Sequence, residues 1–186
     1  MRFYSIIFCI LILCSINSYS KNYISLGTAY NIPMGDLSEV NDNSFSFLLG
    51  YSNRTLCKYW YGLDLFYNEL AENPDRDITD AYLLNNMGAE AFFRYNFNNS
   101  NDYCSNYFPF LKVGLNLNLS EDNLEQSNIG FGYKIGAGYN YGFCFSATCF
   151  DIELSANYIS FGSIYQSGDF GQFNTINTEL KLSVGL

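Results

Sequence analysis

The feature that most constrains this chain is an alternation of apolar and polar residues that recurs in eight segments. Successive side chains of a β-strand point to opposite faces, so a period of two residues predicts strands with two unlike faces. Stretches rich in Asn, Ser, Gly and Asp separate the segments and are typical of turns. The expected strands are residues 23–33, 44–53, 59–70, 82–98, 108–120, 128–142, 149–160 and 174–186.

The two phases of this alternation differ in their chemistry. One phase is apolar or amphipathic throughout, as in Leu111, Val113, Leu115 and Leu117 of the fifth segment. The other phase carries polar residues and the glycines of the segments. The charged residues on this polar phase, which we expect to form one network inside a barrel, are Asp64, Glu90, Arg94, Lys112, Lys134, Asp151, Glu153, Glu179 and Lys181.

This partition predicts an all-β fold, an eight-stranded antiparallel up-and-down transmembrane β-barrel formed by residues 21–186. The interior of such a barrel is just wide enough for side chains, so glycines make room there for long charged residues, while lipid requires an apolar exterior. The predicted inward charges, five acids and four bases, nearly balance, as burial of ions requires. A soluble, lipocalin-like barrel would instead place the apolar phase inside, but its many large side chains exceed the lumen of eight strands.

Aromatic residues on the apolar phase gather at the two ends of the predicted strands, with aliphatic residues between them. Two such girdles are typical of membrane barrels, because aromatic rings favour the membrane–water interface. One predicted girdle consists of Tyr51, Tyr59, Tyr61, Tyr95, Phe97, Tyr139, Tyr141 and Phe150. The other consists of Tyr30, Phe45, Tyr67, Phe131, Tyr133 and Tyr158.

The first 20 residues have the pattern of a cleaved signal peptide. Arg2 supplies a basic start, residues 6–13 are apolar, and Ser18 and Ser20 are small residues before the expected cut. Export and a membrane barrel together place the mature chain in a bacterial outer membrane, in contact with its lipid. The formal net charge of −9 argues against nucleic acids and anionic headgroups as partners.

Four cysteines follow the expected cut, namely Cys57, Cys104, Cys144 and Cys149. An even number of thiols in an exported chain predicts disulfides. Three pairings are open, and we favour Cys144 with Cys149 and Cys57 with Cys104, as clamps on long turns rather than as a redox or partner-binding patch. The spacing does not fit a zinc site, and no metal or cofactor is expected.

Several segments resemble a known family. They are the early loop at residues 32–37, the glycine-spaced strand at 130–139 and the terminal strand at 180–186. They resemble the small outer-membrane proteins of the OmpX and OmpA type, and more closely the outer-membrane β-barrel domain family of Bacteroidetes-like bacteria. The resemblance covers the whole mature chain and implies an outer-membrane barrel. One departure is Leu186, which stands where such families often end on an aromatic residue.

The connections at one end of the predicted barrel are acidic. Only Arg76 opposes these carboxylates, which could hold a cation or meet a cationic extracellular protein, or could simply keep the loops solvated. The acidic residues are Asp36, Glu39, Asp42, Glu72, Asp75, Asp77, Asp80, Glu121, Asp122, Glu125 and Asp169.

Catalysis finds little support in this sequence. The chain has no histidine, so the usual nucleophile–base arrangements are missing, and the spacing of Asp151 and Glu153 merely places both on one face. We therefore expect no enzyme. The leading prediction is a monomeric structural or surface-interaction protein, for adhesion or envelope integrity. A narrow, porin-like channel for small solutes is disfavoured because Arg94, Lys112 and Lys134 should block the lumen.

Overall fold

A computed structural model describes residues 21–55, 58–74, 83–97, 107–122, 127–145, 148–163 and 173–186. These residues form eight strands and one short helix. The elements are β1 (Lys21–Met34), α2 (Asp36–Val40), β2 (Asn41–Thr55), β3 (Tyr59–Glu72), β4 (Leu83–Asn96), β5 (Tyr107–Asp122), β6 (Ser127–Phe145), β7 (Thr148–Ser163) and β8 (Phe173–Gly185).

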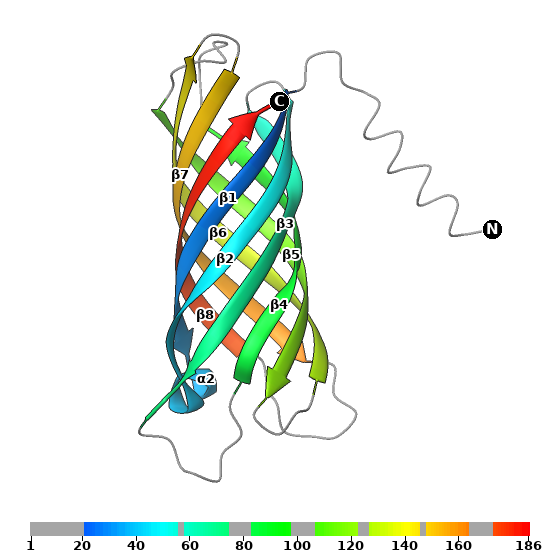
Figure 1. Ribbon diagram of the computed structural model, residues 1–186, viewed down its shortest axis with the longest axis vertical. Helices are drawn as coiled ribbons and strands as arrows, with labels where there is room; N and C mark the ends of the chain where they lie inside the picture. Colours follow the sequence, from blue (N-terminus) through cyan, green and yellow to red (C-terminus); the bar gives the residue numbers. More distant parts are fainter. Residues whose placement is uncertain are drawn as a thin grey trace, which may run out of the picture.

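The strands form one closed barrel in which each strand pairs with its sequence neighbours and β1 also pairs with β8. Every pairing is antiparallel, so the topology is up-and-down (Figure 1). Closure gives each strand a partner on both sides and leaves no open sheet edge. The predicted fold, an eight-stranded antiparallel up-and-down barrel, is confirmed.

The barrel has two distinct ends (Figure 1). At the terminal end, β1 begins, β8 ends, and β2–β3, β4–β5 and β6–β7 are connected. At the helix end lies α2, between β1 and β2, together with the remaining connections.

The helix α2 was not expected from the sequence. It follows Gly35, whose φ of 60° lies in the left-handed region that favours glycine. The helix buries Leu37 against Leu70 of β3 and Phe161 of β7, and Val40 packs beside them. These contacts lie at the helix end and form an apolar stopper, by which we mean Leu37, Leu70 and Phe161.

The outer and inner faces of the barrel differ as the two phases of the sequence differ. Large apolar side chains on all eight strands are exposed, among them Leu26 (64%), Phe47 (68%) and Leu115 (72%). The polar phase is buried, and Asn140 and Glu179 are completely inaccessible. The inverted arrangement of a soluble barrel, with the apolar phase inside, is therefore not the one that the described strands adopt.

Several strand limits differ from the predicted ones. One difference concerns the hairpin of β6 and β7, whose ladder continues to Phe145 paired with Thr148, although the sequence predicted a turn from residue 143. Cys144 and Cys149 therefore lie on strands, directly opposite each other, and not in the turn. The two strands continue to pair because pairing satisfies backbone N–H and C=O groups that a turn would leave to solvent.

Candidate functional site in the barrel interior

The barrel interior contains all nine residues of the predicted charge network, and each of them is buried. The structure adds a tenth charged residue, Arg54, which is 7% exposed. Among the described residues the buried charges are thus five acids and five bases. The acids are Asp64, Glu90, Asp151, Glu153 and Glu179, and the bases are Arg54, Arg94, Lys112, Lys134 and Lys181.

The central part of the interior is a network of lysines and carboxylates from five strands. Lys112 Nζ lies 2.9 Å from Asp64 and 3.3 Å from Glu90. Lys134 Nζ lies 3.0 Å from Glu90 and also bonds Glu179. Lys181 completes the network through an ion pair with Asp64. Because each buried charge has at least one partner of opposite sign, the network avoids the large cost of an isolated buried ion.

Nearer the terminal end, two arginines and two carboxylates carry the remaining buried charges. Arg54 pairs with Asp151, and Arg94 pairs with Glu153. Asp151 also accepts a hydrogen bond of 2.7 Å from Asn140. These pairs link β2 and β4 to β7 across the lumen, so they join strands that are not neighbours in the sheet.

The two guanidinium groups are also stacked between aromatic rings. Arg54 lies 3.2 Å from the ring centre of Tyr23 and 3.5 Å from that of Trp60. Arg94 lies 3.8 Å from Trp60 and 3.6 Å from Phe110. Cation–π attraction is strongest where water is excluded, so this stack adds to the ion pairs at the terminal end. We call these five residues the arginine stack.

Sequence reasoning missed the inward aromatic residues of this stack and Arg54. Arg54 could have been found, because it follows Ser52 on the same phase, but the expected strand ended at residue 53. Cross-strand pairing with glycines explains several inward aromatic residues, including Phe110 of the stack, but not Trp60, which pairs with Arg94. Each of three inward phenylalanines lies opposite a glycine, whose missing side chain leaves room for the ring. The pairs are Phe92 with Gly62, Phe66 with Gly88 and Phe110 with Gly138.

The predicted cysteines are only partly placed. Cys144 and Cys149 form a disulfide across the β6–β7 hairpin at the terminal end. Cys57 and Cys104 lie outside the described residues, so their pairing stays a prediction.

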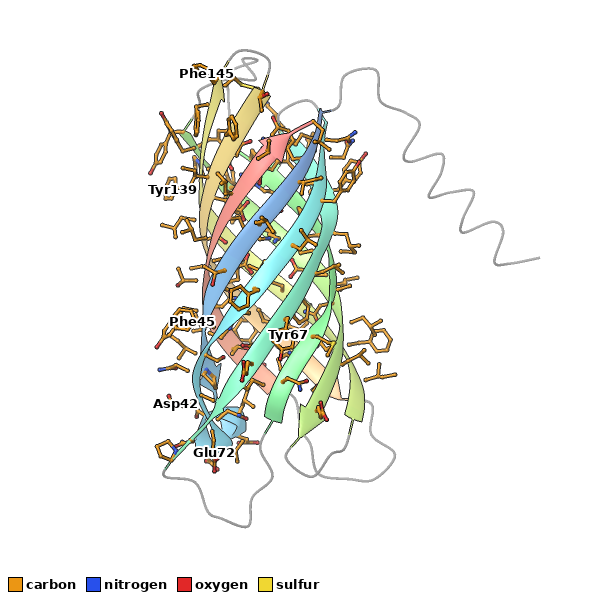
Figure 2. All side chains as sticks on the ribbon, viewed as in Figure 1. Asp42, Phe45, Tyr67, Glu72, Tyr139 and Phe145 are labelled. Carbon is orange, nitrogen blue, oxygen red and sulfur yellow. A yellow bond between two sulfur atoms is a disulfide. The ribbon has the colours of Figure 1, made fainter. Side chains whose placement is uncertain are left out.

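The acidic residues of the predicted rim are also only partly described. Asp36, Glu39, Asp42 and Glu72 are exposed at the helix end, where Figure 2 labels Asp42 and Glu72. Glu121 accepts a hydrogen bond of 3.0 Å from the Asn85 side chain. Asp122 ends β5. The predicted loop residues that lie outside the described part of the chain are Asp75, Arg76, Asp77, Asp80, Glu125 and Asp169.

The described residues offer neither a cluster that could hold a metal ion nor a membrane-spanning helix. In that part of the chain, histidine, cysteine and acidic residues form no group of three or more that could hold a metal ion. None of its helices is long and apolar enough to cross a membrane.

Comparison with known proteins identifies the type of barrel. No protein-family model and no curated protein matches the chain. Among solved structures it is similar to neisserial surface protein A (NspA), with a TM-score of 0.57 and 19% identity over 89% of this chain and 96% of that one. The fold is that of a transmembrane β-barrel. A de novo designed transmembrane β-barrel also matches, with a TM-score of 0.42 and 11% identity over 89% of this chain and 95% of the designed one.

The surface of this transmembrane barrel has the dimensions that a membrane requires. On β3 the outward phase runs from Tyr59 through Leu63 and Leu65 to Tyr67, all exposed, and changes to Glu69 two residues later. A tilted strand crosses a membrane in about 9–11 residues, which matches the stretch from Tyr59 to Tyr67. The resemblance to the OmpX and OmpA type and to the Bacteroidetes family stays a prediction.

Outward aromatic residues lie toward both ends of the transmembrane barrel. Figure 2 shows Tyr139 and Phe145 near the terminal end, and Phe45 and Tyr67 toward the helix end. Rings pair within each group, as in Tyr139 with Tyr107, whose centres are 5.1 Å apart. Tyr107 is 68% exposed and belongs to the terminal group, although it was not among the residues predicted there.

Proposed function

We propose that this protein resides in a bacterial outer membrane as a monomeric barrel that conducts no solutes and acts as a structural or surface-interaction protein. The transmembrane fold and the exposed apolar face support the membrane location. The signal-peptide pattern of residues 1–20 supports export. NspA, with the same fold, carries the name of a surface protein, which agrees with a surface role here.

The observation that carries the proposal is the balanced set of ion pairs across the lumen. Lys112, Lys134 and Glu179 are at most 2% exposed, so no continuous water path passes them in this arrangement. An eight-stranded barrel has little interior space beyond its own side chains. The ion pairs of the interior thus serve the stability of the barrel, and interaction with other macromolecules is left to the ends.

The helix end is the end that we propose to face the outside of the cell. Its connections and the adjoining strand ends carry most of the acidic residues, and each of these connections is longer than the β2–β3 and β6–β7 turns of the terminal end. In membrane barrels the longer connections are extracellular while the periplasmic turns are short. Exposed carboxylates such as Asp42 and Glu72 suit a partner with basic groups or a cation. No enzymatic activity is part of the proposal, since Asp151 and Glu153 are paired with arginines rather than free for proton transfer.

Three measurements test this proposal. Protease treatment of intact cells, followed by mass spectrometry, should give cuts only in the four connections at the helix end, and cuts in the terminal-end turns would refute the orientation. Folded protein should migrate differently on a detergent gel before and after heating. A protein that stays dissolved without detergent would instead favour a soluble barrel. In planar bilayers the purified protein should show no discrete conductance, and regular single-channel steps would favour the narrow channel instead.

A further inference from the structure

A small cavity lies inside the barrel between the central ion-pair network and the apolar stopper. Its volume is about 50 Å³. Glu90, Lys134 and Glu179 of the network line it on one side, and the stopper lines it on the other. Asparagines from five strands line the wall between them, together with apolar residues such as Leu48, Phe66 and Ile159. These asparagines include Asn68, Asn86, Asn116, Asn118 and Asn177. We call this cavity the asparagine chamber.

Several amide groups of the asparagine chamber have no partner among the described residues. Asn86 Oδ1, Asn116 Oδ1 and both side-chain polar atoms of Asn118 form no hydrogen bond there. These three side chains are 6%, 5% and 1% exposed. A buried amide without a partner is costly, and in stable proteins such groups normally have a partner in the protein or in an ordered water. The vacant groups include both donors and acceptors.

The charges around the chamber favour an uncharged guest. Glu90 and Glu179 are both paired with Lys134, and Lys112 also lies 3.3 Å from Glu90. The five acids and five bases of the described interior cancel one another. An ion entering the chamber would therefore bring a buried charge without a partner, which is strongly unfavourable. A neutral molecule with donors and acceptors avoids this cost.

Access to the chamber is possible from one end only. Toward the terminal end the ion-pair network and the arginine stack fill the lumen. Toward the helix end the described residues that close it are those of the stopper, and Leu37 belongs to a five-residue helix at the edge of the barrel. Asn73 donates a hydrogen bond of 2.9 Å to the Ser38 carbonyl, which ties the helix to the end of β3. Displacing this single turn would open the chamber without breaking the barrel ladder.

We propose that the asparagine chamber binds small uncharged hydrogen-bonding molecules, water above all, and that α2 controls its access through Leu37. A cavity needs about 10–15 Å³ to hold one water, so the closed chamber, at about 50 Å³, has room for water. With α2 displaced, neutral polar solutes of similar size reach the asparagines from the helix end. The chamber is thus a dead-end pocket and gives no path across the membrane.

Two serine-to-cysteine probes test this proposal. Ser46 lines the chamber, whereas Ser183 is buried beyond Lys181 toward the terminal end. Both substitutions are made with Cys57→Ser and Cys104→Ser, and the folded protein reacts with iodoacetamide, a small uncharged reagent. Adding Leu37→Ala should speed the reaction of Ser46→Cys by at least about tenfold, because the stopper loses its central side chain. The reaction of Ser183→Cys should not change.

Equal rates for Ser46→Cys with and without Leu37→Ala, or a matching increase at Ser183→Cys, would overturn the gating by α2. Heat-dependent gel migration checks that each variant is folded. A second measurement uses the unaltered protein and does not depend on any variant. Nuclear Overhauser effects from water to the side-chain amides of Asn116 and Asn118 are expected, and their absence in assigned spectra would overturn the bound water.

Discussion

Because the apolar phase faces outward, the free-energy cost of an arginine on this face should depend strongly on its depth in the membrane. The substitution Leu115→Arg tests this. Leu115 is 72% exposed and lies near the middle of the outward phase of β5, which extends from Tyr107 to Glu121. An arginine at the midplane of a membrane barrel costs about 2–4 kcal/mol, whereas near an interface it costs about 0–1 kcal/mol. We therefore expect Leu115→Arg to lower the free energy of unfolding by about 2–4 kcal/mol.

The matched control is Leu119→Arg, on the same strand and the same face. Leu119 is 47% exposed and lies about 13 Å further along the strand, toward the helix end. The same arginine should cost at most about 1 kcal/mol there. Urea titration of the protein folded in lipid vesicles gives both values, with fluorescence of Trp60, the single tryptophan, as the probe. Equal costs at the two positions, or a harmless Leu115→Arg, would refute the assigned facing of β5.

Three further predictions concern the interior and the hairpin, and the same titration checks them. Lys134→Met should destabilise the barrel by about 3–5 kcal/mol, because Glu179 loses its closest cation. Adding Glu179→Gln should restore part of the lost stability, and no restoration would contradict the ion pair. Gly62→Ala should cost about 1–3 kcal/mol, since the new methyl group would overlap the backbone of β2 and the ring of Phe92, whereas Gly114→Ala meets only a flexible side chain and should cost less. Reduction of the β6–β7 disulfide should cost about 2 kcal/mol or less, because it closes a short loop, and a loss of the whole barrel would disagree with this.

The fold could be predicted from sequence because its cause is local and repeated. The same period of two residues recurs in every strand, and lipid outside and a narrow lumen inside impose opposite chemistry on the two phases. The residues of β5 illustrate this, since Lys112 is buried while Leu111 and Val113 are exposed. Neither the register nor the partners of a strand are needed for this conclusion.

The interior arrangement could not be predicted because it depends on register between strands. Phe92 is an apolar residue on the polar phase and interrupts the pattern, and only its pairing with Gly62 explains its place. In the same way, Arg54 completes the charge balance only because β2 extends to Thr55, beyond its predicted end at residue 53. The stopper depends on a contact between Leu37 and Phe161, more than a hundred positions apart in the chain.

The central claim is that the apolar phase contacts lipid while the polar phase fills the lumen. Quenching by lipids brominated at mid-chain tests it directly. Trp60 is 5% exposed and points inward, so its fluorescence should be quenched little in the unaltered protein. In a Trp60→Phe background, Leu115→Trp should be quenched strongly. Strong quenching of Trp60 itself, or no quenching of the tryptophan at position 115, would contradict the account.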